Sequence, residues 1–205
     1  MKSTPIPAPD ATSPLVFLDA LTRDDCRDVR IWRNAIHDLG MLRTTRRLTE
    51  QEQMTFFDEV VTNPRSPHRY FAVRLKCDYP TNVPVLGKLP ATVCFTQFVG
   101  MVGLTNIDAD NGAAEISLIV SPNHRRQGIG ARAVDLVLEE AFDRMRLLTV
   151  YGEVYHCNEP GVTFWAQVIE KHKAIGSILP RRKFWNGRLY SATYFAIPAP
   201  EARAL

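Results

Sequence analysis

The sequence lacks the features that mark secreted, membrane-spanning and metal-binding proteins. Its four cysteines, Cys26, Cys77, Cys94 and Cys157, lie far apart, with no Cys-x-x-Cys pair and no histidine at metal-ligand spacing. It also shows no signal peptide, no long apolar run and no internal repeat. We therefore expect reduced thiols in a cytoplasmic protein, with no bound metal and no membrane partner.

Two common phosphate-binding motifs are missing as well. The segment from Arg125 to Gly130 contains two glycines, but the Lys-Ser or Lys-Thr of a nucleoside-triphosphate loop does not follow it. It is not a dinucleotide fingerprint either, because Ala133 occupies the position of the third glycine and no βαβ unit opens the chain. The sequence thus excludes these two kinds of nucleotide site.

The composition is that of an ordinary globular domain. The apolar fraction is 45%, the charged fraction is 23% and the net charge is +3. This charge suits an anionic ligand but is too small to predict a nucleic-acid-binding protein. Prolines and small polar residues predict a flexible arm at 1–14, a flexible tail at 198–205 and a hairpin insertion at 76–98 within one domain spanning 15–197.

Local patterns between these ends predict alternating strands and helices. Thr22 with Asp25, and Thr49 with Glu52, have the spacing of capping boxes at the starts of two helices. Further helices are predicted from residue 129 and at 162–173. Strands are predicted at 15–18, 70–75, 99–107, 113–120, 147–154 and 188–197.

Residues 113–131 contain the most informative pattern of the chain. An apolar strand is followed by a turn at Pro122 and by a basic loop that opens a helix. The glycines of Arg-x-x-Gly-x-Gly allow backbone N–H groups to approach a bulky anion, and the helix adds its positive end. We interpret the loop as a pyrophosphate site; a structural turn with a solvated basic run is the alternative. It comprises Arg125, Arg126, Gln127, Gly128, Ile129, Gly130 and Ala131.

This loop, placed after a strand, resembles the acyl-CoA loop of the GNAT superfamily of N-acyltransferases. The predicted order of elements is similar to that fold over residues 15–197. The resemblance implies an α/β (α+β) architecture, with a mixed, mostly antiparallel sheet, splayed central parallel strands and helices on both faces. Trp32-Arg33-Asn34 and the Asn-Gly-Arg-Leu-Tyr segment at 186–190 resemble the branch of the ribosomal-protein N-terminal acetyltransferases and their relatives acting on amino sugars and antibiotics.

The resemblance implies an enzyme that transfers acetyl from acetyl-CoA to a primary amine by direct attack, without an acyl-enzyme. The acceptor would be a small molecule, an amino sugar or a protein N-terminus, and the enzyme would be a monomer or a homodimer. Two alternatives remain: a non-catalytic acyl-CoA-binding or interaction module, and an acyltransferase that modifies nucleic acid.

The resemblance also implies where the acyl chain binds. In this family the strand before the loop splays from its neighbour, and its free edge binds the pantetheine arm. This points to the backbone of Leu118, Ile119 and Val120, with the Val120 N–H as an oxyanion donor. Asn158 follows the next strand, where relatives often have a CoA-binding Asn. Turn chemistry before Pro160 explains Asn158 equally well.

Acetyl transfer requires a base, because the amine arrives protonated. Glu115 is the only carboxylate in an otherwise apolar strand, where burial would favour this role. A surface ion pair at the edge of the strand is the alternative.

A second group must reprotonate the leaving thiolate. The family often has a Tyr where this chain has Trp165, and the indole N–H cannot act as an acid. Tyr155, Tyr190 or water would have to replace it, and we select Tyr155. Trp165 itself is expected to belong to the core.

Two basic clusters fall in regions that tend to border the acceptor in this fold. If they converge, we expect an anionic acceptor such as a nucleotide-linked amino sugar, an acidic peptide or a nucleic acid. If they do not, they are solvated surface. The clusters are Arg43, Arg46 and Arg47, and Arg181, Arg182 and Lys183.

Overall fold

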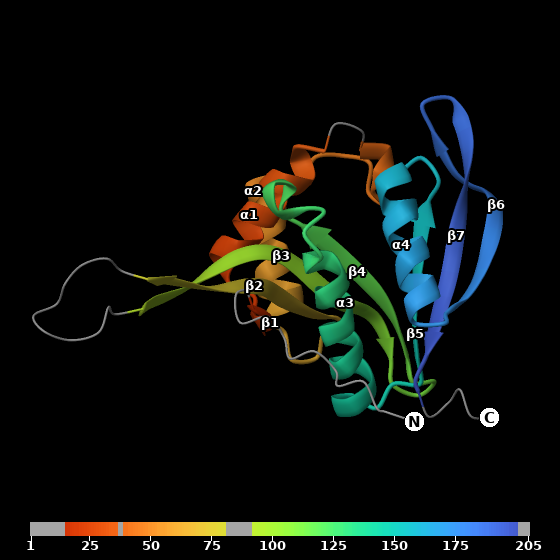
Figure 1. Ribbon diagram of the computed structural model, residues 1–205. Coiled ribbons are helices and arrows are strands. Elements are labelled where there is room, and N and C mark those ends of the chain that lie inside the picture. Colours follow the sequence, from red (N-terminus) through yellow and green to blue (C-terminus); the bar gives the residue numbers. More distant parts are fainter. Residues whose placement is uncertain (1–14, 37–38, 81–91, 201–205) are drawn as a thin grey trace, which may run out of the picture.

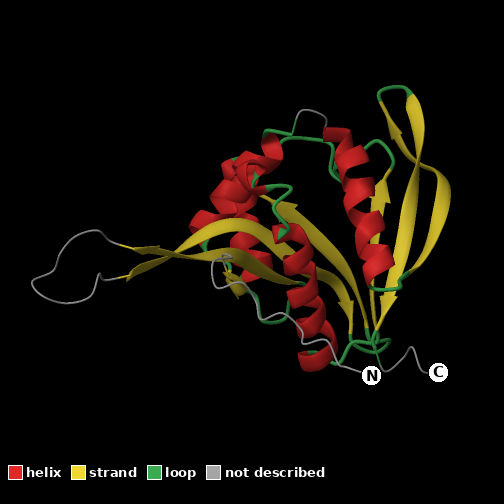
Figure 2. Ribbon diagram, viewed as in Figure 1, coloured by secondary structure: helices red, strands yellow, loops and turns green. Residues whose placement is uncertain are grey.

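The computed structural model describes residues 15–36, 39–80 and 92–200. The predicted arm at 1–14, the centre of the predicted insertion at 76–98 and the last five residues of the predicted tail lie outside this part of the chain. Within it, strands and helices alternate in the predicted order, and helices cover both faces of a sheet (Figure 1, Figure 2).

The sheet has seven strands in the order β1-β2-β3-β4-β5-β7-β6. All neighbouring strands are antiparallel except β4 and β5, which run parallel at the centre. This confirms the predicted fold class. The strands are β1 (Leu15–Ala20), β2 (Arg69–Pro80), β3 (Thr92–Asp108), β4 (Ala113–Val120), β5 (Thr149–Tyr155), β6 (Ile175–Trp185) and β7 (Arg188–Pro198).

Helices pack on the two faces of this sheet. α3 contacts β1, β3 and β4, and α4 contacts β5 and β7, whereas α1 packs beside α2 and reaches β3 from the other face. The α-helices are α1 (Arg23–Asn34), α2 (Glu50–Phe56), α3 (Ile129–Glu139) and α4 (Glu159–Lys171). Short helical turns are η1 (Leu39–Met41), η2 (Phe57–Val61), η3 (Pro122–His124) and η4 (Glu140–Arg144).

Both predicted capping boxes are present. The Thr22 side chain accepts from the Asp25 N–H, and the Asp25 carboxylate accepts from the Thr22 N–H. Thr49 and Glu52 do the same at the start of α2. Each box satisfies N–H groups that a helix start would otherwise leave unpaired. The boundaries of these two helices were therefore predictable from local sequence.

We expect Thr49→Ala to lower the free energy of unfolding by about 1 kcal/mol, because it removes the acceptor of the Glu52 N–H at the start of α2. Urea titration measures the change. Thr163→Ala is the matched control, since Thr163 lies inside α4, where its hydroxyl donates to the Glu159 carbonyl. Its change should be within about 0.5 kcal/mol. Equal losses in the two variants would contradict a capping role.

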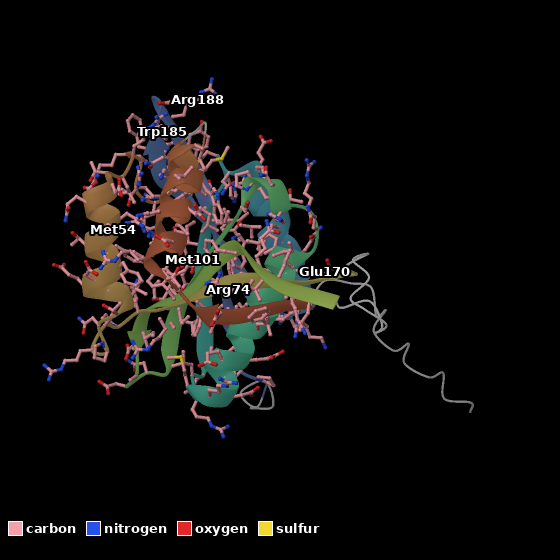
Figure 3. The ribbon with its side chains drawn as sticks, turned by 90° about the vertical axis from the view of Figure 1, so that its left-hand side faces the viewer. Met54, Arg74, Met101, Glu170, Trp185 and Arg188 are labelled. Atoms are coloured by element: carbon pink, nitrogen blue, oxygen red, sulfur yellow. The ribbon has the colours of Figure 1, made fainter. Side chains whose placement is uncertain are left out.

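Two apolar cores lie on opposite faces of the sheet. The larger one joins α3 and α4 to the strands through side chains such as Val102, Val137 and Phe195. The smaller one lies under α1 and α2 and consists of Leu21, Cys26 and Ala72. Met54 of α2 and Met101 of β3 pack against this cluster (Figure 3). Burial raises the pKa of the Cys26 thiol to about 11, so this cysteine stays protonated at neutral pH.

Some boundaries differ from the sequence-based prediction. β2 and β3 extend well into the predicted insertion at 76–98, so part of this region continues the sheet. β6 is an edge strand whose limits the sequence analysis did not predict. Pro180 and a register shift between Leu179 and Lys183 interrupt its alternation of apolar and polar residues. β7 also continues to Pro198, and the Ala199 N–H bonds to the Leu148 carbonyl, so ordered structure reaches into the predicted tail.

Candidate active site

The basic loop predicted to hold a pyrophosphate lies between β4 and α3. We call residues 125–131 the anion loop. Gly128 is the N-cap of α3 with φ 76°, and no side chain caps this helix. Only glycine adopts this backbone conformation without strain. The start of α3 therefore presents backbone N–H groups that no side-chain cap satisfies, together with the positive end of the helix dipole.

The space around the anion loop suits a bulky anion. A Cβ built on Gly128 would meet nothing within 4 Å, whereas one built on Gly130 would come within 3.2 Å of Phe164. The first glycine thus faces open space, and the second allows close packing on α4. Arg125 and Arg126 are both exposed, and Arg125 Nε lies 3.3 Å from the Val120 carbonyl oxygen. Two cations and a set of N–H groups therefore surround this space.

The parallel strands β4 and β5 separate before they reach the anion loop. They pair only over Ala113–Thr149, Ala114–Val150 and Glu115–Tyr151. Beyond these residues, the described chain has no ladder between the two strands. The gap opens toward the loop, as the resemblance predicted.

The backbone groups along β4 are divided between this gap and β3. The Ser121 N–H bonds to the Val99 carbonyl, and β3 and β4 stay in continuous register from Val120 back to Glu115. Because successive residues of a strand point their N–H groups to opposite sides, Ile119 faces β3, as Ser121 does. Leu118 and Val120 turn their N–H and C=O groups to the gap. Of the three predicted pantetheine contacts, these two have backbone groups there.

Glu115 lies at the point where the gap begins, with its side chain 10% exposed. Both carboxylate oxygens pair with the Arg43 guanidinium: Nη1 lies 3.0 Å from Oε2, and Nη2 bonds to Oε1. Asn106 Nδ2 donates a third hydrogen bond to Oε2 at 3.0 Å. The hydrogen bonds to Glu115 raise the pKa of the Arg43 guanidinium above its ordinary value. Glu115 is therefore a buried carboxylate that accepts three hydrogen bonds.

A second buried carboxylate, Glu153 of β5, lies beside Glu115, and sequence reasoning missed it. Its side chain is 6% exposed, Arg182 Nε lies 2.5 Å from its Oε1, and Arg43 Nη2 lies 3.8 Å from its Oε2. The alternation of β5 could have indicated this position, because Tyr151, Glu153 and Tyr155 point to one face of the sheet. Arg43 thus bridges carboxylates from two neighbouring strands.

The two basic clusters do converge. Arg43 of the first cluster and Arg182 of the second meet at Glu153, and both side chains are more than half exposed, at 59% and 54%. Lys183 is buried, donates to the Leu42 carbonyl and lies over the Tyr155 ring at 4.3 Å. Arg46, in contrast, pairs with Glu52 on the surface. Arg43 and Arg182, one from each cluster, therefore place two exposed guanidinium groups over the buried carboxylates of Glu115 and Glu153.

Comparison with known proteins identifies the family. The model of the acetyltransferase (GNAT) family matches residues 46–168, which include the anion loop, Glu115 and Glu153. The chain belongs to this acetyltransferase family. It is an acyl-CoA-dependent N-acetyltransferase that uses acetyl-CoA as co-substrate to acetylate an amine.

Solved structures with this fold include spermidine N-acetyltransferase from Vibrio cholerae. Its complex with CoA and spermine shares 18% identity with this chain and has a TM-score of 0.69. The alignment covers 92% of this chain and 98% of the Vibrio cholerae chain. A point mutant of that enzyme shares 20% identity, covers 92% and 99%, and has a TM-score of 0.65. No curated protein sequence matched the chain. At these identities the likeness concerns the fold.

Other predicted site residues of this acetyltransferase have clear structural positions. Asn158 is the N-cap of α4, and its Oδ1 accepts from the Gly161 N–H at 3.0 Å, which leaves its amide N–H groups for a ligand. Trp165 packs against Phe195 at 4.9 Å between ring centroids, as expected for a core residue. Tyr155 is half-buried at the end of β5, beside Arg43 and Lys183. Tyr155, selected above as the proton donor to the leaving thiolate, thus lies next to Glu153 and the gap.

The Trp32-Arg33-Asn34 motif braces the segment that carries Arg43. Trp32 stacks on Phe98 at 5.1 Å, and Arg33 Nη2 donates to the Thr44 carbonyl at 3.1 Å. Asn34 accepts from the Leu48 N–H and donates to the Leu48 carbonyl. At its other end the segment meets the β6–β7 hairpin, because a Cβ on Gly40 would collide with Trp185 (Figure 3). The backbone on both sides of Arg43 is thus fixed.

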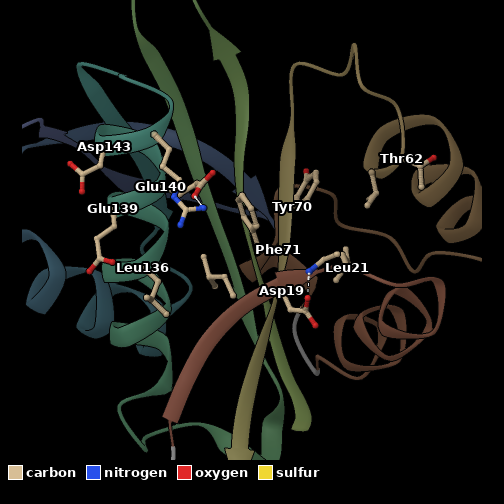
Figure 4. A pocket seen from close by; sticks show the side chains of 13 residues that line it. Asp19, Leu21, Thr62, Tyr70, Phe71, Leu136, Glu139, Glu140 and Asp143 are labelled. Atoms are coloured by element: carbon tan, nitrogen blue, oxygen red, sulfur yellow. Dashed lines mark hydrogen bonds and ion pairs between the residues drawn. The ribbon is translucent and has the colours of Figure 1, made fainter. Parts of the chain in front are cut away.

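A surface pocket of about 940 Å³ lies elsewhere, between β1, β2, η2 and the helix formed by α3 and η4 (Figure 4). Its lining includes no residue of the anion loop, β4 or β5. Asp19, Glu139, Glu140 and Asp143 make it acidic, with Arg144 paired to Glu140 at 3.3 Å. Such a lining repels the phosphates of CoA, which favours the gap and the anion loop as the acyl-CoA site.

Two further features bear on the class of protein. Among the described residues, no group of His, Cys, Asp and Glu is arranged to hold a metal ion. In the same part of the chain, no helix combines the length and apolarity needed to cross a membrane.

Proposed function

We propose that this acetyltransferase acetylates a primary amine on an acceptor that also carries an anionic group. The observation that supports this proposal is the pair of exposed guanidiniums, Arg43 and Arg182, oriented by buried carboxylates beneath them. Guanidinium groups fixed in this way bind phosphate or carboxylate through charge-assisted hydrogen bonds. An amino sugar phosphate, a nucleotide-linked amino sugar and an acidic peptide N-terminus all have the required combination of groups.

The acyl-CoA site in this proposal follows the gap between β4 and β5. Arg125, Arg126 and the N–H groups of the anion loop, Gln127 to Ala131, bind the pyrophosphate. Leu118 and Val120 bind the pantetheine arm through their backbone, and Ile119 contributes its side chain. Asn158 binds CoA through its amide N–H groups. Acetyl-CoA supplies an activated acetyl thioester at the open end of the gap.

Acetyl transfer then needs two proton movements. Glu115 takes one proton from the acceptor ammonium, and the resulting amine nitrogen bonds to the acetyl carbon as the carbon–sulfur bond breaks. The Val120 N–H stabilises the negative charge that develops on the acetyl oxygen. Tyr155 donates a proton to the leaving CoA thiolate. The second proton that the nitrogen releases then returns to Tyr155. Glu115 returns its proton to solvent.

A polyamine acceptor is the second candidate. The Vibrio cholerae enzyme of similar fold was solved with spermine. In this chain, burial and then the nearby Glu115 raise the pKa of Tyr151 and of Tyr194, whose stacked rings lie 5.7 Å apart. Aromatic rings beside a carboxylate can hold an ammonium group. A polyamine would, however, have to displace Arg43 and Arg182 from this site.

The remaining assignments are also proposals. The short sequence matches favour the branch of ribosomal-protein N-terminal acetyltransferases, which would make an acidic N-terminus the acceptor. The buried thiol of Cys26 suits a cytoplasmic location. We retain monomer or homodimer as the assembly and treat nucleic acid as the least favoured acceptor, since the net charge is only +3.

A matched acceptor pair tests the proposed function. With acetyl-CoA and release of the CoA thiol as readout, we expect glucosamine 6-phosphate to have kcat/KM at least about tenfold above that of glucosamine, and above that of spermidine. Arg182→Gln should reduce this preference about tenfold, because a charge-assisted hydrogen bond contributes about 1.5 kcal/mol or more. Arg144→Gln, on the far η4 surface, is the control and should preserve the preference. Faster acetylation of spermidine than of the phosphate would favour the polyamine candidate instead.

A further inference from the structure

Glu115 is held in a state that conflicts with its proposed role as a base. Its Oε1 accepts from Arg43, and its Oε2 accepts from both Arg43 and Asn106. A carboxylate has about four lone-pair positions, and three of those of Glu115 are occupied. The bidentate Arg43 guanidinium lies across both oxygens on their exposed side. The acceptor ammonium can reach Glu115 only after the Arg43 guanidinium has moved.

The position of Arg43 allows this movement. Its side chain is 59% exposed and covers a carboxylate that is 10% exposed, so the guanidinium lies on the solvent side of Glu115. The adjoining backbone is anchored by Lys183 at the Leu42 carbonyl and by Arg33 at the Thr44 carbonyl. The side chain can therefore leave Glu115 by changing rotamer, without movement of the segment.

Glu115 also keeps a partner when Arg43 leaves. Asn106 comes from β3, where the register shifts between Thr105 and Asp108, and it has φ 51°. Asn tolerates this left-handed conformation better than most residues. The side-chain amide of Asn106 donates to Glu115 Oε2, and the backbone N–H of Asn106 donates to His68 Nδ1 at 3.1 Å. This arrangement holds the carboxylate in place while its other oxygen becomes free.

We propose that Arg43 is a latch that the acceptor itself opens. The anionic group of the acceptor binds the exposed Arg43 guanidinium and draws it from Glu115, and the freed carboxylate takes a proton from the acceptor ammonium. The latch rests on the proposed function and deepens it: the anion on the acceptor activates the base as well as providing affinity. An amine without an anionic group leaves the latch closed.

The charges around the latch are suited to this exchange. Arg182 stays paired with Glu153 when Arg43 moves, so Glu153 is not left without a cation. The freed Glu115 carries one negative charge, which the incoming ammonium balances. Besides Arg43, the titratable and charged groups near Glu115 are Tyr70 of β2, Tyr151, Glu153 and Tyr155 of β5, Arg182 and Lys183 of β6, Tyr194 of β7, and His68 behind Asn106.

Arg43→Met tests the latch, with Arg46→Met as the matched control from the same segment, since Arg46 pairs with Glu52. Acetylation of glucosamine and of glucosamine 6-phosphate is measured for each protein. For Arg43→Met we expect kcat for glucosamine to rise about tenfold, and KM for the phosphate to rise about tenfold or more. Arg46→Met should resemble the parent. An equal loss with both amines would mean that Arg43 only supports Glu115, and the latch would be wrong.

A binding measurement separates this inference from the proposed function. Calorimetry with glucosamine 6-phosphate, in the presence of CoA, should give an affinity that falls at least about tenfold in Arg43→Met. Arg43→Lys should recover part of this affinity, because it restores the charge without the bidentate geometry. Equal affinity in the parent and Arg43→Met, or no binding by the parent, overturns the latch. Binding that depends on Arg43, without thiol release from any amine, contradicts the proposed function alone.

Discussion

Replacing Glu115 by glutamine is expected to lower kcat about a hundredfold or more while leaving the affinity for CoA unchanged, because general-base catalysis contributes about this much. The amide keeps the size of the side chain and one oxygen to accept from Arg43 or Asn106, so the site should remain folded. The CoA site is expected to be unaffected, because the anion loop and the gap-facing backbone of β4 do not depend on the carboxylate charge.

The pH dependence of this loss is diagnostic. A base is needed only while the acceptor arrives protonated, and reference amines have a pKa of about 8 for an N-terminus and about 10.4 for Lys. The deficit of Glu115→Gln should therefore shrink as the pH approaches the pKa of the amine. A residue that only positions the acceptor would give a deficit that persists at high pH.

Glu153→Gln is the matched control, since Glu153 is a similarly buried glutamate paired with an arginine one strand away. We expect a smaller deficit for it, with no dependence on the protonation of the amine. Parent-like turnover of Glu115→Gln at neutral pH would contradict the base role. The proton would then have to pass to water held by backbone carbonyls.

The features that could be predicted from sequence are local ones. A capping box needs residues three positions apart, so Thr22 with Asp25 fixed the start of α1 without knowledge of the fold. The anion loop likewise encodes its own conformation, because a glycine at Gly128 permits φ 76° and the helix follows directly. The central strand β4 was predicted with its observed limits because an apolar run ends at a turn-forming proline.

The features that could not be predicted depend on contacts between distant residues. Arg43 and Glu115 are 72 positions apart, and no local pattern connects them. Arg43 reads as one of several surface arginines, and only the packed fold shows that it covers a buried carboxylate while Arg46 does not. The sequence alone left open whether the two clusters converge, and it did not predict that Glu153 lies beneath them or that Glu115 pairs with Arg43.

These buried charges also explain why the site can be selective. Two carboxylates out of water are unfavourable unless cations and hydrogen bonds compensate them, so Glu115 and Glu153 require Arg43, Arg182 and Asn106. An acceptor that enters must maintain this compensation. An ammonium paired with an anion does so, because the ammonium can replace Arg43 at Glu115 while the anion receives the displaced guanidinium.

Gly128→Ala is expected to raise the Kd for CoA about a hundredfold or more, which corresponds to about 2.7 kcal/mol of binding free energy. The Cβ would project into open space beside the anion loop, where no residue other than the chain neighbours of Gly128 comes within 4 Å. A pyrophosphate held by backbone N–H groups needs direct contact with them, and a fixed helix start cannot move away from a methyl group. Calorimetry with CoA measures the change.

Gly187→Ala is the control, because Gly187 has nearly the same conformation, with φ 74°, and a Cβ there also meets nothing within 4 Å. It lies in the turn between β6 and β7, away from the anion loop. Both variants should lose about 1–2 kcal/mol of folding stability, since alanine is strained in the left-handed region. Only Gly128→Ala should also lose the rise in melting temperature that CoA produces by binding the folded state. If CoA binds and stabilises both variants as it does the parent, the loop between β4 and α3 is a structural turn, and the pyrophosphate site must lie elsewhere.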